Sequence, residues 1–317
     1  MRKAALLYNP GSGGSKQHQS DLESALSVLR NGGVDAALVP TESPQHALEE
    51  TRRSIDSGCD TIFACGGDGT IHNIAQVLAN SSAALGILPL GTANALAHDI
   101  CLPLRVVAAA KASLLATPRR IALGRVKYSD LQGNPATRYF VVTAGIGVDA
   151  HLFYKLHAGT KQRIGMAAYY AKAWNLWFSY PMTRFVAEYT GAGSDTRRQV
   201  EVTELMAVRI RNFGGVLQEL APGASLDRDD MRLVFCRTAS RLAYLAYVTR
   251  GLLRRRWTIP GIDLAYSTSV SCSYRSPTHP SPEQRKIYVE ADGELLGTLP
   301  VEITVVPNLL TLLTPPR

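Results

Sequence analysis

In the first third of the chain, hydrophobic positions follow two periods in turn, one typical of strands and one of helices. Four short apolar runs predict buried strands at Lys3–Tyr8, Asp35–Pro40, Asp60–Cys65 and Ala83–Pro89. Between these runs, apolar residues recur at helical spacing, as they do over about 17–31. Strands that alternate with helices indicate parallel βαβ units. We therefore expect an α/β domain with a doubly wound parallel sheet.

The pattern changes after about residue 119, where short β-type runs replace the alternation. Examples are Thr137–Ile146 and Val200–Ile210, and two stretches, at about 163–178 and 241–253, have helical spacing instead. This part is expected to be a β-rich, sandwich-like domain. The predicted boundaries are 1–118 for the first domain and 119–304 for the second, and the tail at about 305–317 is a candidate to return to the first domain.

Composition and charge narrow the class of protein. Of the 317 residues, 46% are hydrophobic and 19% are charged, which is typical of a soluble globular chain. The net charge of +8 favours an anionic partner, which could be nucleic acid, anionic lipid or a phosphorylated substrate. No helix-turn-helix or zinc pattern is present, so nucleic acid is not expected. The five cysteines contain no CxxC pair, which favours reduced thiols.

Membrane insertion is not predicted. The apolar run at the N-terminus is interrupted by Asn9-Pro10, too early for a signal peptide, and no run of about 18 apolar residues follows. We expect a cytoplasmic protein whose membrane contact is peripheral. The sequence allows a dimer but does not encode the oligomeric state.

Three glycine-containing loops follow predicted strands, at Asn9–Gly13, Gly66–Thr70 and Gly91–Asn94. Glycine lets the backbone approach phosphate oxygens and direct its N–H groups at them. One such loop is more often an ordinary tight turn, but three at the carboxyl ends of strands favour a nucleotide site. Neither GxxxxGK[ST] nor GxGxxG occurs, which excludes the P-loop and Rossmann types.

The second loop contains an acid, Asp68, between Gly67 and Gly69. A carboxylate repels phosphate unless a divalent cation lies between them, and Mg²⁺ held by a carboxylate and by phosphates is the usual arrangement. The alternative is a turn aspartate that bonds to nearby backbone, since Asp-Gly is a common turn pair.

The motif "GGDGT" at Gly66–Thr70 resembles the diacylglycerol kinase catalytic-domain family, which includes bacterial YegS-like lipid kinases and sphingosine kinases. Further segments resemble the family in the expected order along nearly the whole chain: "NPGSGG" (Asn9–Gly14), "PLGTANALA" (Pro89–Ala97), "APGASLDRDDMRLVF" (Ala221–Phe235) and "VEADGE" (Val289–Glu294). "GGDGT" alone is shared with NAD kinases and, more loosely, with phosphofructokinases. The ordered set is more specific.

The resemblance implies an ATP- and Mg²⁺-dependent lipid kinase, acting on a hydroxyl of a diacylglycerol-like or sphingoid lipid, in phospholipid biosynthesis. It implies nucleotide contacts from the residues Asn9, Pro10, Gly11, Ser12, Gly13, Thr41, Gly66, Gly67, Asp68, Gly69, Thr70, Ile71, His72, Gly91, Thr92 and Asn94. It also leaves two other functions to consider, an NAD kinase-like enzyme and a catalytically weak nucleotide- or lipid-binding regulator.

The resemblance also implies the chemical roles. Asp68 would organise Mg²⁺–ATP, and Asp292 or Glu294 would be the general base that accepts the proton of the lipid hydroxyl. A second, structural Mg²⁺ would be held by Asp229 and by the carbonyls of Leu226 and Met231.

The chain departs from the family at two places. His72-Asn73 stands where most relatives have Asn-Glu, and Asp230 stands where they have glycine.

A basic stretch near residue 250 is the candidate membrane contact. It contains Arg250, Arg254, Arg255, Arg256 and the aromatic Trp257. Arginines beside an interfacial tryptophan suit anionic lipid. The alternative is a solvated helix end, where the helix dipole favours arginine. An aromatic stretch at 167–181 is expected to be core or cleft wall.

Overall fold

The computed structural model describes residues 1–11, 16–148, 150, 182–193, 196–214, 219–253, 257–275 and 286–316. The chain divides into two compact units. Unit 1 comprises Met1–Leu123, Asn212–Val216 and Val306–Arg317, and unit 2 comprises Gly124–Arg211 and Leu217–Val305. The α/β fold with a strand-rich C-terminal region confirms the predicted fold class.

Unit 1 contains a parallel sheet of alternating strands and helices. Its strands are β1 (Lys3–Tyr8), β2 (Asp35–Pro40), β3 (Thr61–Gly66), β4 (Ala84–Pro89) and the last part of β15 (Glu294–Thr314). They pair in the order β2-β1-β3-β4-β15, and every pair is parallel. β3 and β4 are buried along their whole length, as their continuous apolar runs predict.

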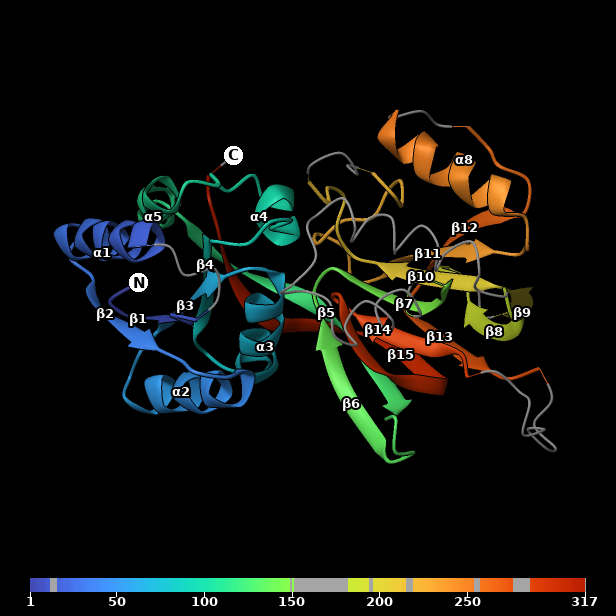
Figure 1. The fold of residues 1–317 in the computed structure, drawn as a ribbon, viewed down its shortest axis with the longest axis horizontal. Helices are drawn as coiled ribbons and strands as arrows, with labels where there is room; N and C mark the ends of the chain where they lie inside the picture. The colour runs from blue at the N-terminus through green and yellow to red at the C-terminus, as the bar shows by residue number, and fades with distance from the viewer. Residues whose placement is uncertain are drawn as a thin grey trace. The chain divides into compact units, whose positions relative to one another are not determined.

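Helices cover both faces of this sheet (Figure 1). They are α1 (Lys16–Asn31), α2 (Pro44–Asp56), α3 (Asp68–Leu78), α4 (Ala95–Asp99) and α5 (Val106–Leu114). α1 packs against α5 on one face, and α2 packs against α3 on the other. α2 begins as predicted, because the Ser43 side chain accepts a hydrogen bond from the backbone N–H of His46 and Pro44 occupies the first turn.

Unit 2 is mainly antiparallel. Its strands are β6 (Pro135–Phe140), β7 (Thr143–Gly147), β8 (Phe185–Thr190), β9 (Arg197–Val202), β10 (Glu204–Val208), β11 (Met231–Cys236), β12 (Ile262–Ser267), β13 (Ser269–Ser273), β14 (Tyr288–Ala291) and the first part of β15. Part of β5 (Thr117–Ser129) also belongs to it. The main order is β12-β11-β10-β7-β14-β15, and β13, β8 and β9 extend from β15. Aromatic and branched side chains such as Phe140, Phe185 and Leu205 fill its core.

Several elements differ from the sequence-based expectation. The run at Thr137–Ile146 is two strands, because the chain leaves the ladder between β6 and β7. The helix expected from Thr70 begins at Asp68. The helix expected at about 241–253 is confirmed as α8 (Arg241–Leu252). The stretch at about 163–178 lies outside the described residues, as does the aromatic segment 167–181.

Candidate active site

The carboxyl ends of β1, β2, β3 and β4 lie at one edge of the parallel sheet, and each continues into a predicted nucleotide loop. After β1, the Asn9 side-chain oxygen accepts a hydrogen bond from the Gly11 backbone N–H at 2.8 Å, which tightens the turn. Pro10 and Gly11 are exposed there. Ser12 and Gly13 lie outside the described residues.

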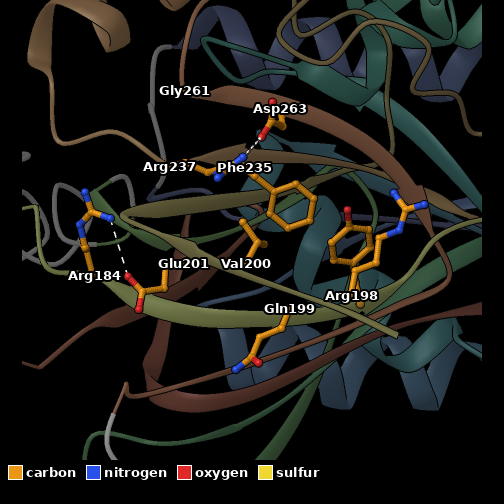
Figure 2. Close-up of a pocket in the computed structure, with 10 residues that line it drawn as sticks. Arg184, Arg198, Gln199, Val200, Glu201, Phe235, Arg237, Gly261 and Asp263 are labelled. Carbon is orange, nitrogen blue, oxygen red and sulfur yellow. Dashed lines mark hydrogen bonds and ion pairs between the residues drawn. The ribbon is translucent and has the colours of Figure 1, made fainter. Parts of the chain in front are cut away.

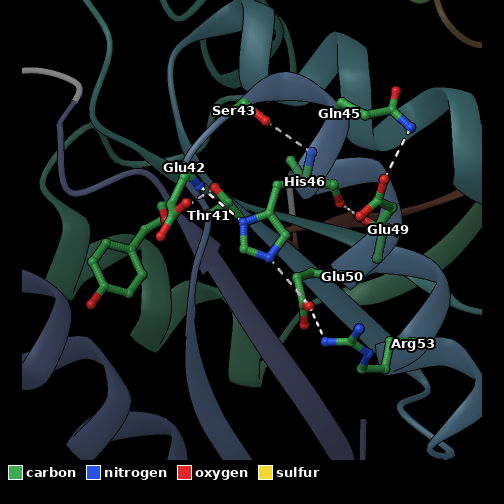
Figure 3. Close-up of polar contacts among 11 residues, drawn as sticks. Thr41, Glu42, Ser43, Gln45, His46, Glu49, Glu50 and Arg53 are labelled. Carbon is green, nitrogen blue, oxygen red and sulfur yellow. Dashed lines mark hydrogen bonds and ion pairs between the residues drawn. The ribbon is translucent and has the colours of Figure 1, made fainter.

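The loop after β2 is fixed to β1 and to the first turn of α2 (Figure 3). The Thr41 backbone N–H and hydroxyl both donate to the carbonyl of Tyr8, at 2.8 and 3.2 Å. His46 accepts from the Glu42 backbone N–H through Nδ1 at 3.3 Å, and its Nε2 lies 3.4 Å from the Glu50 carboxylate. These contacts hold buried Thr41 in place at the edge of the sheet.

The loops after β3 and β4 touch through two glycines. A Cβ placed on Gly91 would lie 2.5 Å from the Gly67 Cα and 2.8 Å from the Asn94 Oδ1. A Cβ on Gly66 would collide with the Thr70 side chain. Only glycine permits this close approach of two backbones. The sequence therefore needs glycine here for packing between loops, whether or not a phosphate binds.

Asp68 joins the same two loops. Its Oδ1 accepts a hydrogen bond from the Ala95 backbone N–H, the first residue of α4, at 2.8 Å. The Asn94 side chain closes the third loop, since its Oδ1 accepts from the Gly91 N–H at 3.0 Å and its Nδ2 donates to the Gly91 carbonyl at 2.8 Å. The backbone role that the sequence left open for Asp68 is thus observed, but between loops rather than within one turn.

The remaining predicted residues of this edge differ in exposure. Gly69 and Thr70 are half-buried in the first turn of α3, and Thr92 is exposed. Ile71 and His72 are buried on the inner side of α3. The side chain at position 72 is therefore part of the core of unit 1.

In unit 2, Asp292 and Gly293 form the tight turn between β14 and β15. Both have positive φ, 48° and 81°, as a two-residue type I′ hairpin turn requires. The Asp292 carboxylate accepts three backbone hydrogen bonds, from the N–H groups of Val141, Val142 and Thr143 at 2.8, 2.9 and 3.0 Å. These donors are the residues at which the β6–β7 run breaks, which explains the break.

Glu294 has a different environment from Asp292. It begins β15 opposite Ala291 and is half-buried. Within the described part of the chain, its carboxylate makes no hydrogen bond and no ion pair. The neighbouring acid Glu290 is fully buried and accepts a hydrogen bond from the Gly293 N–H at 2.9 Å.

Two of the predicted structural metal residues, Leu226 and Asp229, lie in the segment between β10 and β11, and the third, Met231, is the first residue of β11. Leu226 and Met231 are buried, and Asp229 is exposed. Among the described residues, no group of three His, Cys, Asp or Glu side chains converges, so a metal ion here would depend on the Asp229 carboxylate and on backbone carbonyls. Sequence reasoning missed Arg209, which is fully buried beneath this segment. Burial lowers the pKa of Arg209 to about 10, while the charges of Asp229 and Asp230 oppose that shift.

A pocket of about 960 Å³ lies in unit 2 and contains none of the predicted site residues (Figure 2). Its lining consists of Arg184, Tyr189, Arg198, Gln199, Val200, Glu201, Phe235, Arg237, Gly261 and Asp263. The rings of Tyr189 and Phe235 are 4.7 Å apart, and two of the arginines pair with acids of the lining. The charges are therefore largely balanced within the pocket.

The predicted basic membrane contact is only partly described. Arg250 is buried: its guanidinium donates to the carbonyls of Trp257 and Leu220 and lies 4.4 Å from the Tyr247 ring centre. Trp257 is exposed. Arg254, Arg255 and Arg256 lie outside the described residues. No helix in the described ranges is long and apolar enough to cross a bilayer.

Two solved structures with this fold are kinases. A crystal structure of a diacylglycerol kinase from Bacillus anthracis has a TM-score of 0.71 at 18% identity, covering 99% of this chain and 97% of that one. Yeast NADH kinase is more distant, with a TM-score of 0.52 at 11% identity, covering 99% and 83%. At these identities the likeness concerns the fold alone. It shows that this chain shares the fold of these two proteins.

Sequence comparisons distinguish between diacylglycerol kinases and NADH kinase. Residues 3–126 match the diacylglycerol kinase catalytic domain. Diacylglycerol kinase of Bacillus subtilis is 27% identical over 95% of this chain and 93% of its own, and that of Staphylococcus saprophyticus is 26% identical over 99% and 96%. Residues 3–126 thus resemble the diacylglycerol kinase catalytic domain, and nearly the whole chain resembles bacterial diacylglycerol kinases, in agreement with the resemblance that the order of the motifs indicates. This confirms the predicted enzyme class, a lipid kinase.

Proposed function

We propose that this protein transfers the γ-phosphoryl group of ATP to a hydroxyl of a diacylglycerol-like or sphingoid lipid. The observation that supports this most strongly is the pair of touching loops at Gly67 and Gly91, at the carboxyl ends of β3 and β4. Ligands of open α/β sheets bind beyond these strand ends. Backbone N–H groups that no Cβ shields can approach phosphate oxygens closely.

In this proposal Asp68 has two tasks. Its bond to the Ala95 N–H fixes the second loop to the third. It is also the only carboxylate among the predicted nucleotide residues. A single acid fits a Mg²⁺ that is held mainly by phosphate oxygens and water. When bound, Mg²⁺ supplies neutralisation of phosphate charge, while the loops position the nucleotide.

We assign the general base to Glu294 rather than Asp292. A base needs an oxygen that can approach the hydroxyl proton. Both oxygens of Asp292 already accept backbone N–H groups, so this residue positions the hairpin. Glu294, two residues further, has no such bond in the described part of the chain. The three hydrogen bonds to the Asp292 carboxylate, called the Asp292 clamp below, would thereby hold Glu294 on a rigid turn.

Membrane contact is assigned to the outer face of α8. Leu242, Leu245 and Val248 follow one another at helical spacing and are 78%, 40% and 39% exposed. Exposed apolar residues on one helix face can enter the interfacial region of a bilayer. Arg250 points inward instead, so it supports α8 rather than contacting lipid.

Vesicle binding tests this surface. We expect Leu242→Ser with Leu245→Ser to weaken sedimentation with phosphatidylglycerol vesicles by about tenfold, because apolar area is lost from the contact. Leu115→Ser is the matched control, since Leu115 is an exposed leucine of unit 1. Equal weakening by the control variant would contradict the assignment to α8.

The central test is transfer of radiolabelled phosphate from ATP to a panel of acceptors: diacylglycerol, ceramide, sphingosine and NAD, with and without Mg²⁺. We expect a labelled lipid and no labelled NAD. Labelling of NAD alone would favour the NAD kinase-like alternative. ATP binding without transfer to any acceptor would favour a regulator and would refute the kinase proposal.

A further inference from the structure

Residues 226–231, which end at the first residue of β11, are held on their inner side by a buried arginine. Arg209 follows β10, and its backbone N–H continues the ladder by donating to the Val142 carbonyl at 2.9 Å. Its guanidinium Nη1 donates to two carbonyls of the segment, those of Arg228, at 2.7 Å, and of Asp230. The side chain is 0% exposed. Two carbonyls of the segment therefore point at one cationic nitrogen, in the way that carbonyls point at a bound metal ion.

The acids of the segment are also matched by arginines. Arg228 binds the Asp230 carboxylate through two bonds, Nε to Oδ1 at 2.6 Å and Nη2 to Oδ2 at 2.5 Å. Such two-point pairing is the strongest form of arginine–carboxylate contact. Arg228 and Arg232 each lie 4.1 Å from the centre of the Tyr266 ring. The segment is therefore braced by guanidinium groups and one aromatic ring.

The formal charges of the segment and its arginines also balance. Asp227, Asp229 and Asp230 carry three negative charges, and Arg209, Arg228 and Arg232 carry three positive ones. A site for Mg²⁺ normally has a surplus of carboxylate oxygens. Here a divalent ion would add two charges close to a guanidinium that is already buried, which is unfavourable at short range in a protein interior.

We propose that the Arg209 guanidinium, supported by Arg228, takes the structural place of a metal ion under residues 226–231, so that this segment folds without a divalent cation. The residues present do not fit the second Mg²⁺ that the family resemblance implies for Leu226, Asp229 and Met231. The proposal concerns unit 2 alone and does not depend on Mg²⁺ bound with ATP.

The first test is the metal content and thermal stability of the full-length protein without nucleotide. After dialysis against EDTA, we expect element analysis to find far less than one Mg²⁺ or Ca²⁺ per chain. The melting temperature should then be the same, within about 1 °C, in EDTA, millimolar Mg²⁺ or millimolar Ca²⁺. One retained metal ion per chain that Asp229→Asn releases, or a melting temperature that falls in EDTA, would overturn the proposal.

The second test removes the internal cation. Arg209→Gln keeps a hydrogen-bond donor but no charge, so we expect a melting temperature lower by about 5 °C or more in EDTA, partly restored by millimolar Ca²⁺ or Mg²⁺. Arg237→Gln is the matched control, because it removes an arginine of the same unit whose ion-pair partner is Asp263 and not an acid of the segment, and should show no response to metal.

Two other results of the second test would overturn the proposal. An unchanged melting temperature in Arg209→Gln would show that the guanidinium does not hold the segment. A lower melting temperature that ignores metal would show that it acts only as a hydrogen-bond donor, and either result overturns the proposal. If Arg209→Gln does not fold, the metal content of the unmodified protein decides, since that measurement needs no variant.

Discussion

Asp68 in unit 1 and Asp292 in unit 2 have similar structural roles, because both carboxylates accept hydrogen bonds from backbone N–H groups. Asp68 is the first residue of α3 and Asp292 is the first residue of a hairpin turn. A glycine follows each of them, and each accepts backbone hydrogen bonding from outside its own turn. Asp68 accepts from one N–H of the third glycine loop, that of Ala95. Asp292 accepts from three consecutive N–H groups, at Val141, Val142 and Thr143.

In the proposed mechanism the two aspartates differ in role: Asp292 is a clamp alone, whereas Asp68 is both a clamp and a partner of Mg²⁺. Three backbone donors fix both oxygens of Asp292 toward the protein, which suits positioning, and the proposal therefore gives the proton transfer to Glu294. Asp68 is tied to the other loop by one bond, at an edge where the backbones of Gly67 and Gly91 are in contact. An aspartate–glycine pair in the sequence is therefore compatible with either role. The contacts that tertiary structure brings to it decide which role it has.

The largest expected effect concerns the base next to the clamp. Glu294→Gln should lower the rate of phosphoryl transfer by about 10²–10⁴-fold, because the proton acceptor is lost. Unfolding free energy should change by less than about 0.5 kcal/mol. Single-turnover transfer from ATP and urea unfolding measure the two quantities. The matched control is Glu302→Gln, an exposed acid on the same strand that pairs with Lys127. A fully active Glu294→Gln would end the distinction between base and clamp.

The clamp itself is tested by Asp292→Asn, which keeps a residue that tolerates positive φ. The amide has one acceptor oxygen, so its NH₂ group would face an N–H donor where the carboxylate accepted one. We expect unfolding free energy to fall by about 2–3 kcal/mol. Urea unfolding measures this loss. A variant as stable as the unmodified protein would mean that the three bonds do not order the β6–β7 break.

The close approach of the loops in unit 1 is tested by Gly91→Ala. The new Cβ would lie 2.5 Å from the Gly67 Cα, so the loops must separate. We expect a loss of about 1–3 kcal/mol in unfolding free energy, together with weaker ATP binding measured by calorimetry. Gly191→Ala is the control, because a Cβ there meets no atom within 4 Å. Undiminished ATP affinity in Gly91→Ala would separate this contact from nucleotide binding.

Among the variants that remove a structural contact, those of Asp68 should lose the least stability, and two variants divide its tasks. Asp68→Asn keeps an oxygen that can accept from the Ala95 N–H, whereas Asp68→Ala does not. We expect Asp68→Ala to be less stable than Asp68→Asn by about 1 kcal/mol, and both to have lost most phosphoryl transfer. Thermal unfolding and the transfer assay measure this. If Asp68→Asn transferred phosphate at the normal rate, its charge would not be needed and the residue would be a clamp alone.

The elements of unit 1 could be predicted closely because their signals are local. Continuous apolar runs specify buried parallel strands, and Ser43-Pro44 marks the start of α2. The Asp292-Gly293 turn was also legible, since Asp-Gly between β-runs favours a two-residue hairpin. Unit 2 was harder. The run at Thr137–Ile146 has no local signal for its break, because the group that causes it, Asp292, is about 150 residues away.

Arg209 shows a signal that was present but not used. In β10, Leu205 and Ala207 point into the core, and Arg209 continues their alternation as the next position of the same face. An arginine at a core position must find acceptors inside the protein. The pattern could thus have indicated a buried cation. It could not have identified the carbonyls of Arg228 and Asp230 as its partners, because backbone groups carry no sequence signal.

The sequence by itself determined which residue types stand at the ends of the strands: glycines at 66, 67 and 91, and acids at 68, 292 and 294. It also determined the order of motifs that resembles the diacylglycerol kinase catalytic-domain family. Tertiary structure alone decided what these residues contact. It committed Asp292 to three backbone donors, brought the Gly67 and Gly91 backbones together and directed the Arg209 guanidinium at the Arg228 carbonyl. The physical reason is that hydrogen bonds and charge pairing depend on distance in space, and distance along the chain does not encode it.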